Sequence, residues 1–143
     1  PRYSALGIYL PSLHSPAMGP IVVAIDTSGS VDDVLLSQFQ TEVQGIADDL
    51  RPARVHVICC DSQVRGHEVF ERDDQIQIKA SGGGGTDFRP VFEEVAKMDE
   101  PPVAVVYLTD LLGAFPDREP DVPVLWASTG SRVAPFGEVI AVE

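Results

Sequence analysis

The sequence has no hydrophobic run long enough to cross a membrane. A helix that spans a bilayer needs roughly 20 consecutive apolar residues, and no run in this chain approaches that length. The basic, then apolar, then small-residue order of a signal peptide is also missing. The chain begins at Pro1 rather than at a methionine, so we expect it to be a fragment of a longer protein.

Cysteine is scarce, and its placement excludes two common kinds of site. Cys59 and Cys60 are the only cysteines and are neighbours in an apolar run. Successive side chains of a strand point to opposite faces, so the two thiols cannot easily form a disulfide. Two cysteines at this spacing provide neither a disulfide framework nor a zinc site. We therefore predict a reducing, cytoplasmic setting.

Basic residues are few: 10 Lys and Arg stand against 22 Asp and Glu, which gives a net charge of −12. A surface this acidic repels nucleic acid phosphates and anionic lipids. We therefore expect no nucleic acid and no membrane among the partners. Most of the carboxylates are expected to be solvated, and only a few to be placed where they can bind a metal.

Three apolar runs predict strands that are buried on both faces, as in a parallel sheet. Each run ends at an aspartate, which places three carboxylates at the same edge of the sheet. The runs are residues 21–25 before Asp26, residues 54–61 ending at Asp61, and residues 103–109 before Asp110.

Helical patterns separate these runs. Asp32 or Asp33 provides an N-cap for apolar residues at helical spacing, and Pro52 ends that helix. Pro90 marks the start of a second helix, whereas two prolines between Asp110 and Val122 predict a loop. Shorter strands are expected at residues 64–71, 75–79, 122–126 and 138–142.

This alternation predicts an α/β fold: a doubly wound, mostly parallel sheet with helices on both faces, Rossmann-like but with few helices. At 143 residues the chain fits one domain. We expect residues 1–19 to form a strap or edge strand that leads from an upstream domain. Residues 20–143 are expected to form the domain itself.

Oxygen-bearing side chains cluster where these strands end. Ligands of open α/β sheets bind at the carboxyl ends of the strands, and hard cations such as Mg²⁺ prefer oxygen ligands. A turn eased by Gly29 and the glycine run at 82–85 would let separate loops approach one point. The predicted metal ligands are Asp26, Ser28, Ser30, Thr86 and Asp110.

This set of residues resembles the metal-ion-dependent adhesion site of von Willebrand factor A domains. Asp26-x-Ser28-x-Ser30, a later threonine and an aspartate after a buried strand occur in the same order as in that family, over roughly residues 20–142. The phrases IDTSGS, GGGGTDFRPVFEE, YLTD and PVLW are similar to one subgroup. Its members are the carboxyl-terminal A-like domains of bacterial proteins whose upstream region carries a metallopeptidase signature.

The resemblance implies a function and a role for each ligand. Ser28, Ser30 and Thr86 would bind the metal directly, with Asp26 and Asp110 bound partly through water. The metal would be Mg²⁺, or Mn²⁺ or Ca²⁺, and a Glu or Asp of a protein partner would complete its coordination. The partner could be a linked peptidase-like region or an AAA-type ATPase.

Structural roles compete with the metal-binding roles. The turn at residues 26–30 could simply cap the first helix, and Asp32 and Asp33 favour its positive end. Asp61 could support the metal ligands from behind or only hold a loop. Asp87 is expected to cap the second helix or fix its loop, with contact to the metal shell as the alternative.

Other motifs are incomplete. The glycine run lacks the lysine of a phosphate-binding loop, and His67-Glu68 is followed by Glu71 where a zinc peptidase helix needs a second histidine. His14 and His56 stand alone in the sequence and are expected to be structural. Trp126 is expected to pack in the core or at its rim.

No nucleophile–base pair such as Ser–His is evident, so we expect this domain not to be an enzyme. A metal-dependent protein-interaction module is the leading hypothesis. The alternatives are a Mg²⁺-dependent phosphohydrolase, although Ser28 replaces the second aspartate of one common phosphatase motif, and a structural domain whose metal stabilises the loops.

Overall fold

The computed structural model describes residues 19–29, 31–79, 83–129 and 132–141. The elements are β1 (Ile21–Asp26), α1 (Asp33–Leu50), β2 (Arg54–Cys60), β3 (Val64–Glu71), α2 (Arg89–Ala96), β4 (Val105–Thr109), β5 (Val124–Ser128) and β6 (Glu138–Ala141). The predicted strap at residues 1–19 lies almost entirely outside this part of the chain, and the domain boundary stays a prediction.

The strands form one twisted sheet in the order β3-β2-β1-β4-β5-β6. All neighbouring pairs are parallel except β2 and β3, which are antiparallel. From the central pair β1 and β4, the chain continues to β2 on one side and to β5 on the other. Ligands of such sheets usually bind where the direction changes, at the carboxyl ends of the two central strands.

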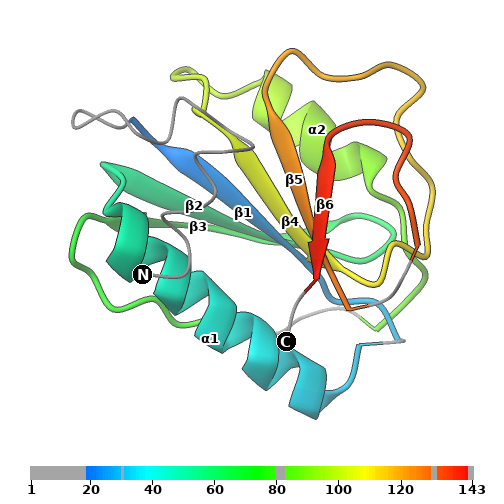
Figure 1. Ribbon diagram of the computed structural model, residues 1–143, viewed down its shortest axis with the longest axis horizontal. Helices are drawn as coiled ribbons and strands as arrows, with labels where there is room; N and C mark the ends of the chain where they lie inside the picture. Colours follow the sequence, from blue (N-terminus) through cyan, green and yellow to red (C-terminus); the bar gives the residue numbers. More distant parts are fainter. Residues whose placement is uncertain (1–18, 30, 80–82, 130–131, 142–143) are drawn as a thin grey trace.

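One helix covers each face of the sheet, with α1 along one side and α2 on the other (Figure 1). On the α1 side, Phe39, Val43 and Ile46 are buried against the sheet. The α2 side is aromatic, with Phe88, Phe92, Tyr107 and Trp126 in mutual contact. The predicted α/β fold with few helices is therefore confirmed.

The two ends of α1 lie where the sequence predicts them, after Asp32 and before Pro52. The Asp32 carboxylate accepts a hydrogen bond from the backbone N–H of Leu35 (2.9 Å), which makes Asp32 the N-cap. Arg51 at the other end has φ of 46°, a left-handed conformation that closes the helix just before Pro52. Cys59 and Cys60 face the two different cores, so they cannot form a disulfide.

The strand predicted at residues 75–79 is wrong. This segment is an irregular strap over α1, and glutamine side chains satisfy its backbone. Gln40 bonds both the N–H of Ile78 (2.8 Å) and the carbonyl of Ile76 (2.7 Å), and Gln44 accepts from the N–H of Ile76 (3.0 Å). Its alternating burial, which imitates a strand, comes from packing on the helix.

Trp126 lies in the middle of β5 rather than at its end and is fully buried. Its indole N–H donates to the carbonyl of Phe136 (3.0 Å). In the part of the chain that the structure describes, no helix is long and apolar enough to span a membrane.

Candidate metal site

Asp26 is the centre of the candidate site and is held by hydrogen bonds from Ser28 and Thr109. It is the last residue of β1 and is fully buried. One carboxylate oxygen accepts from the N–H of Ser28 (2.9 Å), and the other accepts from the hydroxyl of Thr109 (2.7 Å). Because Thr109 is the last residue of the neighbouring strand β4, the carboxylate is fixed between the two central strands.

The electrostatic surroundings of Asp26 do not suit a lone anion. Burial raises the pKa of Asp26, the hydrogen bonds from Ser28 and Thr109 lower it, and the nearby Asp110 carboxylate raises it again. No Lys, Arg or His of the described residues forms an ion pair with it. A cation bound beside Asp26 would therefore stabilise its charge.

The loop after β1 is joined to the glycine run by two backbone hydrogen bonds. The N–H of Gly83 donates to the carbonyl of Thr27 (2.9 Å), and the N–H of Gly29 donates to the carbonyl of Gly84 (3.0 Å). A Cβ at position 29 would lie 2.9 Å from the Gly83 carbonyl oxygen, and Gly83 itself has φ of 113°. Glycine at both positions thus permits the close approach that the sequence predicted.

Thr86 and Asp110 reach the same edge from two further loops. The methyl group of Thr86 packs against Gly113, where a Cβ would approach it to 2.6 Å. Gly113 follows Asp110 by three residues, and the Asp110 carboxylate accepts from the N–H of Leu112 (3.0 Å). A hydrogen bond from the N–H of Phe88 to the carbonyl of Ala114 (2.9 Å) secures the two loops to each other.

The structure therefore brings four of the five predicted ligands to one edge of the sheet. Asp26 and Ser28 follow β1, Asp110 follows β4, and Thr86 ends the joined glycine loop. The fifth, Ser30, lies outside the described residues. Within the described ranges no group of three or more His, Cys, Asp or Glu side chains is placed to hold a metal. A cation here would depend on hydroxyl oxygens in addition to the two carboxylates, and such a donor set suits a hard ion.

Asp61 ends the next strand, but its charge is already balanced. Its carboxylate accepts from the Arg65 side chain (2.8 Å) and from the N–H groups of Gln63 and Gly84 (both 3.2 Å). These contacts, the Arg65 hydrogen bond first, lower the pKa of Asp61 to about 2. Asp61 thus fixes the glycine loop, and its predicted support of a metal ligand stays a prediction.

Asp87 is also paired with a guanidinium. Both of its carboxylate oxygens accept from the Arg89 side chain (2.9 and 2.8 Å), which lowers the pKa of Asp87. One oxygen also accepts from the backbone N–H of Arg89 (3.0 Å) at the start of α2. This contact agrees with the expected structural role, while contact with a metal shell stays a prediction.

Two residues have contacts that the sequence analysis missed. Thr109 was seen only as the residue before Asp110, although a hydroxyl at the end of a strand beside Asp26 could have drawn attention to it. His56, expected to stand alone, lies 2.8 Å from a ring nitrogen of His67. The register of the antiparallel β2–β3 pair creates this contact, and the sequence alone does not reveal that register.

The chain belongs to the VWA-like domain family (DUF2201), whose model matches residues 21–143. No curated protein matches its sequence significantly. The family assignment confirms the A-like part of the resemblance, and VWA-like domains commonly serve as protein-interaction modules.

Two solved structures share the fold. The crystal structure of the ArnB paralog VWA2 from Sulfolobus acidocaldarius is 19% identical with a TM-score of 0.61, and the match covers 81% of this chain and 35% of that one. The crystal structure of an aerotolerance-related membrane protein from Bacteroides fragilis, with multiple mutations to serines, is 15% identical with a TM-score of 0.58. That match covers 77% of this chain and 67% of that one. This chain therefore spans about a third of the Sulfolobus protein.

Proposed function

We propose that this domain binds one divalent cation at the carboxyl edge of β1 and β4 and uses it to hold a carboxylate of a protein partner. The observation that carries the proposal is Asp26: a fully buried carboxylate that forms no ion pair with a basic side chain of the described residues. A buried charge without a counterion is costly. A bound cation would remove that cost.

The donor set is consistent with Mg²⁺, with Mn²⁺ or Ca²⁺ as the alternatives. Ser28 and Thr86 would offer hydroxyl oxygens, and Asp26 and Asp110 would offer carboxylate oxygens directly or through water. Ser30 joins them on the strength of the sequence motif. When bound, the cation would supply an electrophilic position that an incoming carboxylate can occupy.

The surrounding hydrogen bonds would keep these donors in place before the ion arrives. Thr109 and the Ser28 N–H orient Asp26, and the two loop–loop hydrogen bonds hold the glycine run against the β1 loop. A site prepared in this way loses little conformational entropy on binding. The domain itself would be non-catalytic, acting in the cytoplasm beside a linked peptidase-like region or an AAA-type ATPase.

Calorimetric titration of chelator-treated protein with Mg²⁺ and Mn²⁺ tests the metal site. We expect saturable binding at one site, and a loss of affinity in Asp26→Ala and Thr86→Ala above the roughly 10- to 100-fold that removal of an outer-shell partner costs. Asp121→Asn, which removes a carboxylate from the loop before β5, is the matched control and should bind as the wild type does. No binding to the wild type would contradict the proposal.

The carboxylate step has its own measurement. Mn²⁺ enhances the relaxation of water protons, and acetate that replaces a metal-bound water should reduce this enhancement in the wild type. An unchanged enhancement at saturating acetate would leave a metal that only stabilises the loops. Hydrolysis of p-nitrophenyl phosphate that Asp26→Ala abolishes would instead support the phosphohydrolase alternative.

A further inference from the structure

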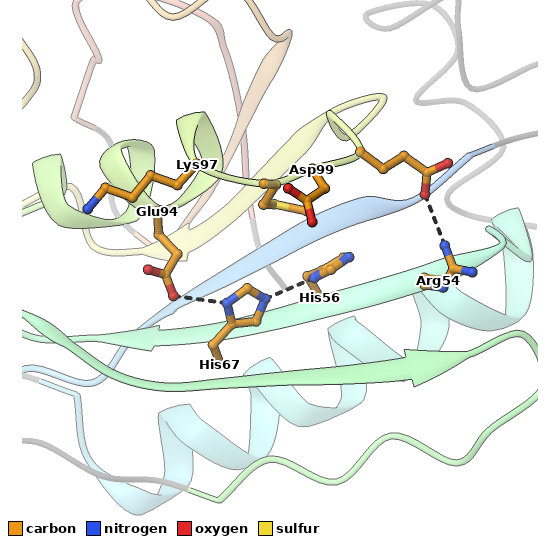
Figure 2. Close-up of a pocket in the computed structure, with 8 residues that line it drawn as sticks. Arg54, His56, His67, Glu94, Lys97 and Asp99 are labelled. Carbon is orange, nitrogen blue, oxygen red and sulfur yellow. Dashed lines mark hydrogen bonds and ion pairs between the residues drawn. The ribbon is translucent and has the colours of Figure 1, made fainter.

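A chain of three titratable side chains connects three elements on the α2 side of the sheet, away from the strand ends. His56 lies on β2, His67 on β3 and Glu94 on α2. Nδ1 of His56 lies 2.8 Å from Nε2 of His67, and Nδ1 of His67 lies 2.9 Å from a carboxylate oxygen of Glu94. Figure 2 shows the three side chains in this order along the floor of a pocket of about 450 Å³.

The two imidazole rings meet head to head. Their centroids are 5.1 Å apart, which equals the 2.8 Å between the nitrogens plus the two ring radii. The two nitrogens therefore face each other and not a shared third position. Ligands of one metal ion must both point at the metal, so this geometry favours a proton between the rings over a metal.

The positions of the protons follow from the Glu94 carboxylate, which can only accept hydrogen bonds. Nδ1 of His67 must donate to it, so Nε2 of a neutral His67 is an acceptor. Nδ1 of His56 must then donate to that acceptor, which leaves Nε2 of His56 with a lone pair at the outer end of the chain. Each link thus has one donor and one acceptor.

We propose that this chain is a proton-operated latch in which the His67–Glu94 pair of β3 and α2 holds His56 of β2, and that the latch stays closed with one added proton and opens at the His56–His67 contact with a second. A first proton at the outer nitrogen of His56 leaves both hydrogen bonds intact. It can also shift along the chain, so that the positive charge lies beside Glu94. A second proton places an N–H on both facing nitrogens, and the two positive rings then repel each other. The contact that opens is therefore the one between His56 and His67, whereas the charged His67 binds the Glu94 carboxylate more strongly.

His56 is surrounded by charges of both signs, and burial together with the neighbouring basic groups resists charging of its ring. Burial lowers the pKa of His56, and His67 and Arg54 lower it further, whereas Glu100 and Glu71 raise it. The titratable and charged groups around the pair are Arg54 on β2, Glu71 on β3, Glu94 on α2, and Lys97, Asp99 and Glu100 after α2.

The sign of the resulting pH dependence follows. The pKa of His56 is lower in the folded protein than the ordinary value of 6.5, so the folded state favours the neutral ring. Its contribution to stability is therefore fully present above about pH 6.5 and is lost as the pH falls toward its lowered pKa.

NMR titration of the imidazole nitrogens in a His14→Gln background tests the latch. We expect the two remaining histidines to titrate in two separated steps that belong to the pair. Glu94→Gln should move the first step to lower pH because it removes the carboxylate that favours the charge. Two independent single-proton titrations, unchanged in Glu94→Gln, would overturn the proposal.

Hydrogen exchange of the amides in the β2–β3 pair measures the opening itself. In the wild type we expect exchange to become about tenfold faster once the second proton binds. His56→Asn is the matched control: its amide can accept from a charged His67 but cannot take up a proton, so exchange should not accelerate. Equal acceleration in both proteins would refute the latch, and saturable Ni²⁺ binding that His67→Gln removes would show a metal site in its place.

Discussion

Asp26 and Asp61 lie at the ends of neighbouring parallel strands, at the same edge of the sheet, yet the protein stabilises the charge of only one of them. Their side chains are equally hidden, with exposures of 0% and 1%. Asp61 receives a guanidinium and two backbone N–H groups, and its pKa falls to about 2. Asp26 accepts hydrogen bonds only from Ser28 and Thr109 and has no guanidinium beside it, so burial, with a smaller effect of the nearby Asp110, raises its pKa.

The difference separates a structural carboxylate from one suited to binding. Asp61 gains from being charged in the folded protein because the chain supplies its counterion. The charge of Asp26 destabilises the folded protein unless an external cation binds beside it. A strand that ends in aspartate therefore determines where a carboxylate lies, whereas the nearest positive charge determines what it does.

The largest effect is expected when Asp61 is replaced. Asp61→Asn removes the ion pair with Arg65 and turns an amide N–H toward the N–H of Gly84 or Gln63. We expect a loss of about 2–3 kcal/mol in the free energy of unfolding at pH 7, measured by urea denaturation. Arg65→Gln leaves the buried Asp61 carboxylate without its counterion and should lose a comparable amount.

The pH dependence of this loss is a second check on Asp61. A lowered folded-state pKa contributes stability that is present above the ordinary value of 3.8 and is lost as the pH falls toward about 2. The difference between wild type and Asp61→Asn should therefore shrink over that interval. A difference that is constant down to pH 2 would show that the charge is irrelevant.

The opposite sign is expected for Asp26. Without metal, Asp26→Asn should stabilise the protein by about 1 kcal/mol at pH 7, because a buried charge is removed while the amide keeps the contact with Ser28. The free energy of unfolding of the wild type should fall by this amount as the pH rises from 3.8 through the raised pKa of Asp26, because the buried carboxyl then becomes charged. Saturating Mg²⁺ should reverse the order by stabilising only the wild type. If Asp26→Asn were less stable than the wild type in excess chelator, the charge of Asp26 would stabilise the fold as that of Asp61 does, and the contrast between them would be wrong.

The fold was predictable because its strong signals are local. Three apolar runs, the Asp32 cap and Pro52 determine the central strands and the long helix. Residues 75–79 were misassigned because alternating burial looks the same whether a segment pairs with a strand or packs on a helix. Only the positions of Gln40 and Gln44, more than 30 residues earlier, show that side chains replace the sheet partner.

The site was predictable in position but not in its supporting contacts. The rule that strands end at a common edge places Asp26 and Asp110 together, and the glycines indicate close loops. The different partners of Asp26 and Asp61 could not be read from the strand pattern that both share. The Thr109–Asp26 hydrogen bond spans 83 residues and depends on the β1–β4 pairing, which the sequence does not specify.

Thr109 provides the smallest test of this arrangement. Thr109→Val keeps the shape of the side chain but removes the hydroxyl that donates to Asp26 and accepts from the N–H of Leu111 (3.1 Å). We expect a loss of about 1 kcal/mol in stability and a roughly tenfold weaker affinity for Mg²⁺, because an orienting partner of a ligand is lost. Thr109→Ser restores the hydroxyl and should recover the affinity even if the missing methyl group lowers stability. Equal affinities for Mg²⁺ in Thr109→Val and Thr109→Ser would show that the hydroxyl contributes only to the backbone contact with Leu111, and that its hydrogen bond to Asp26 does not affect cation binding.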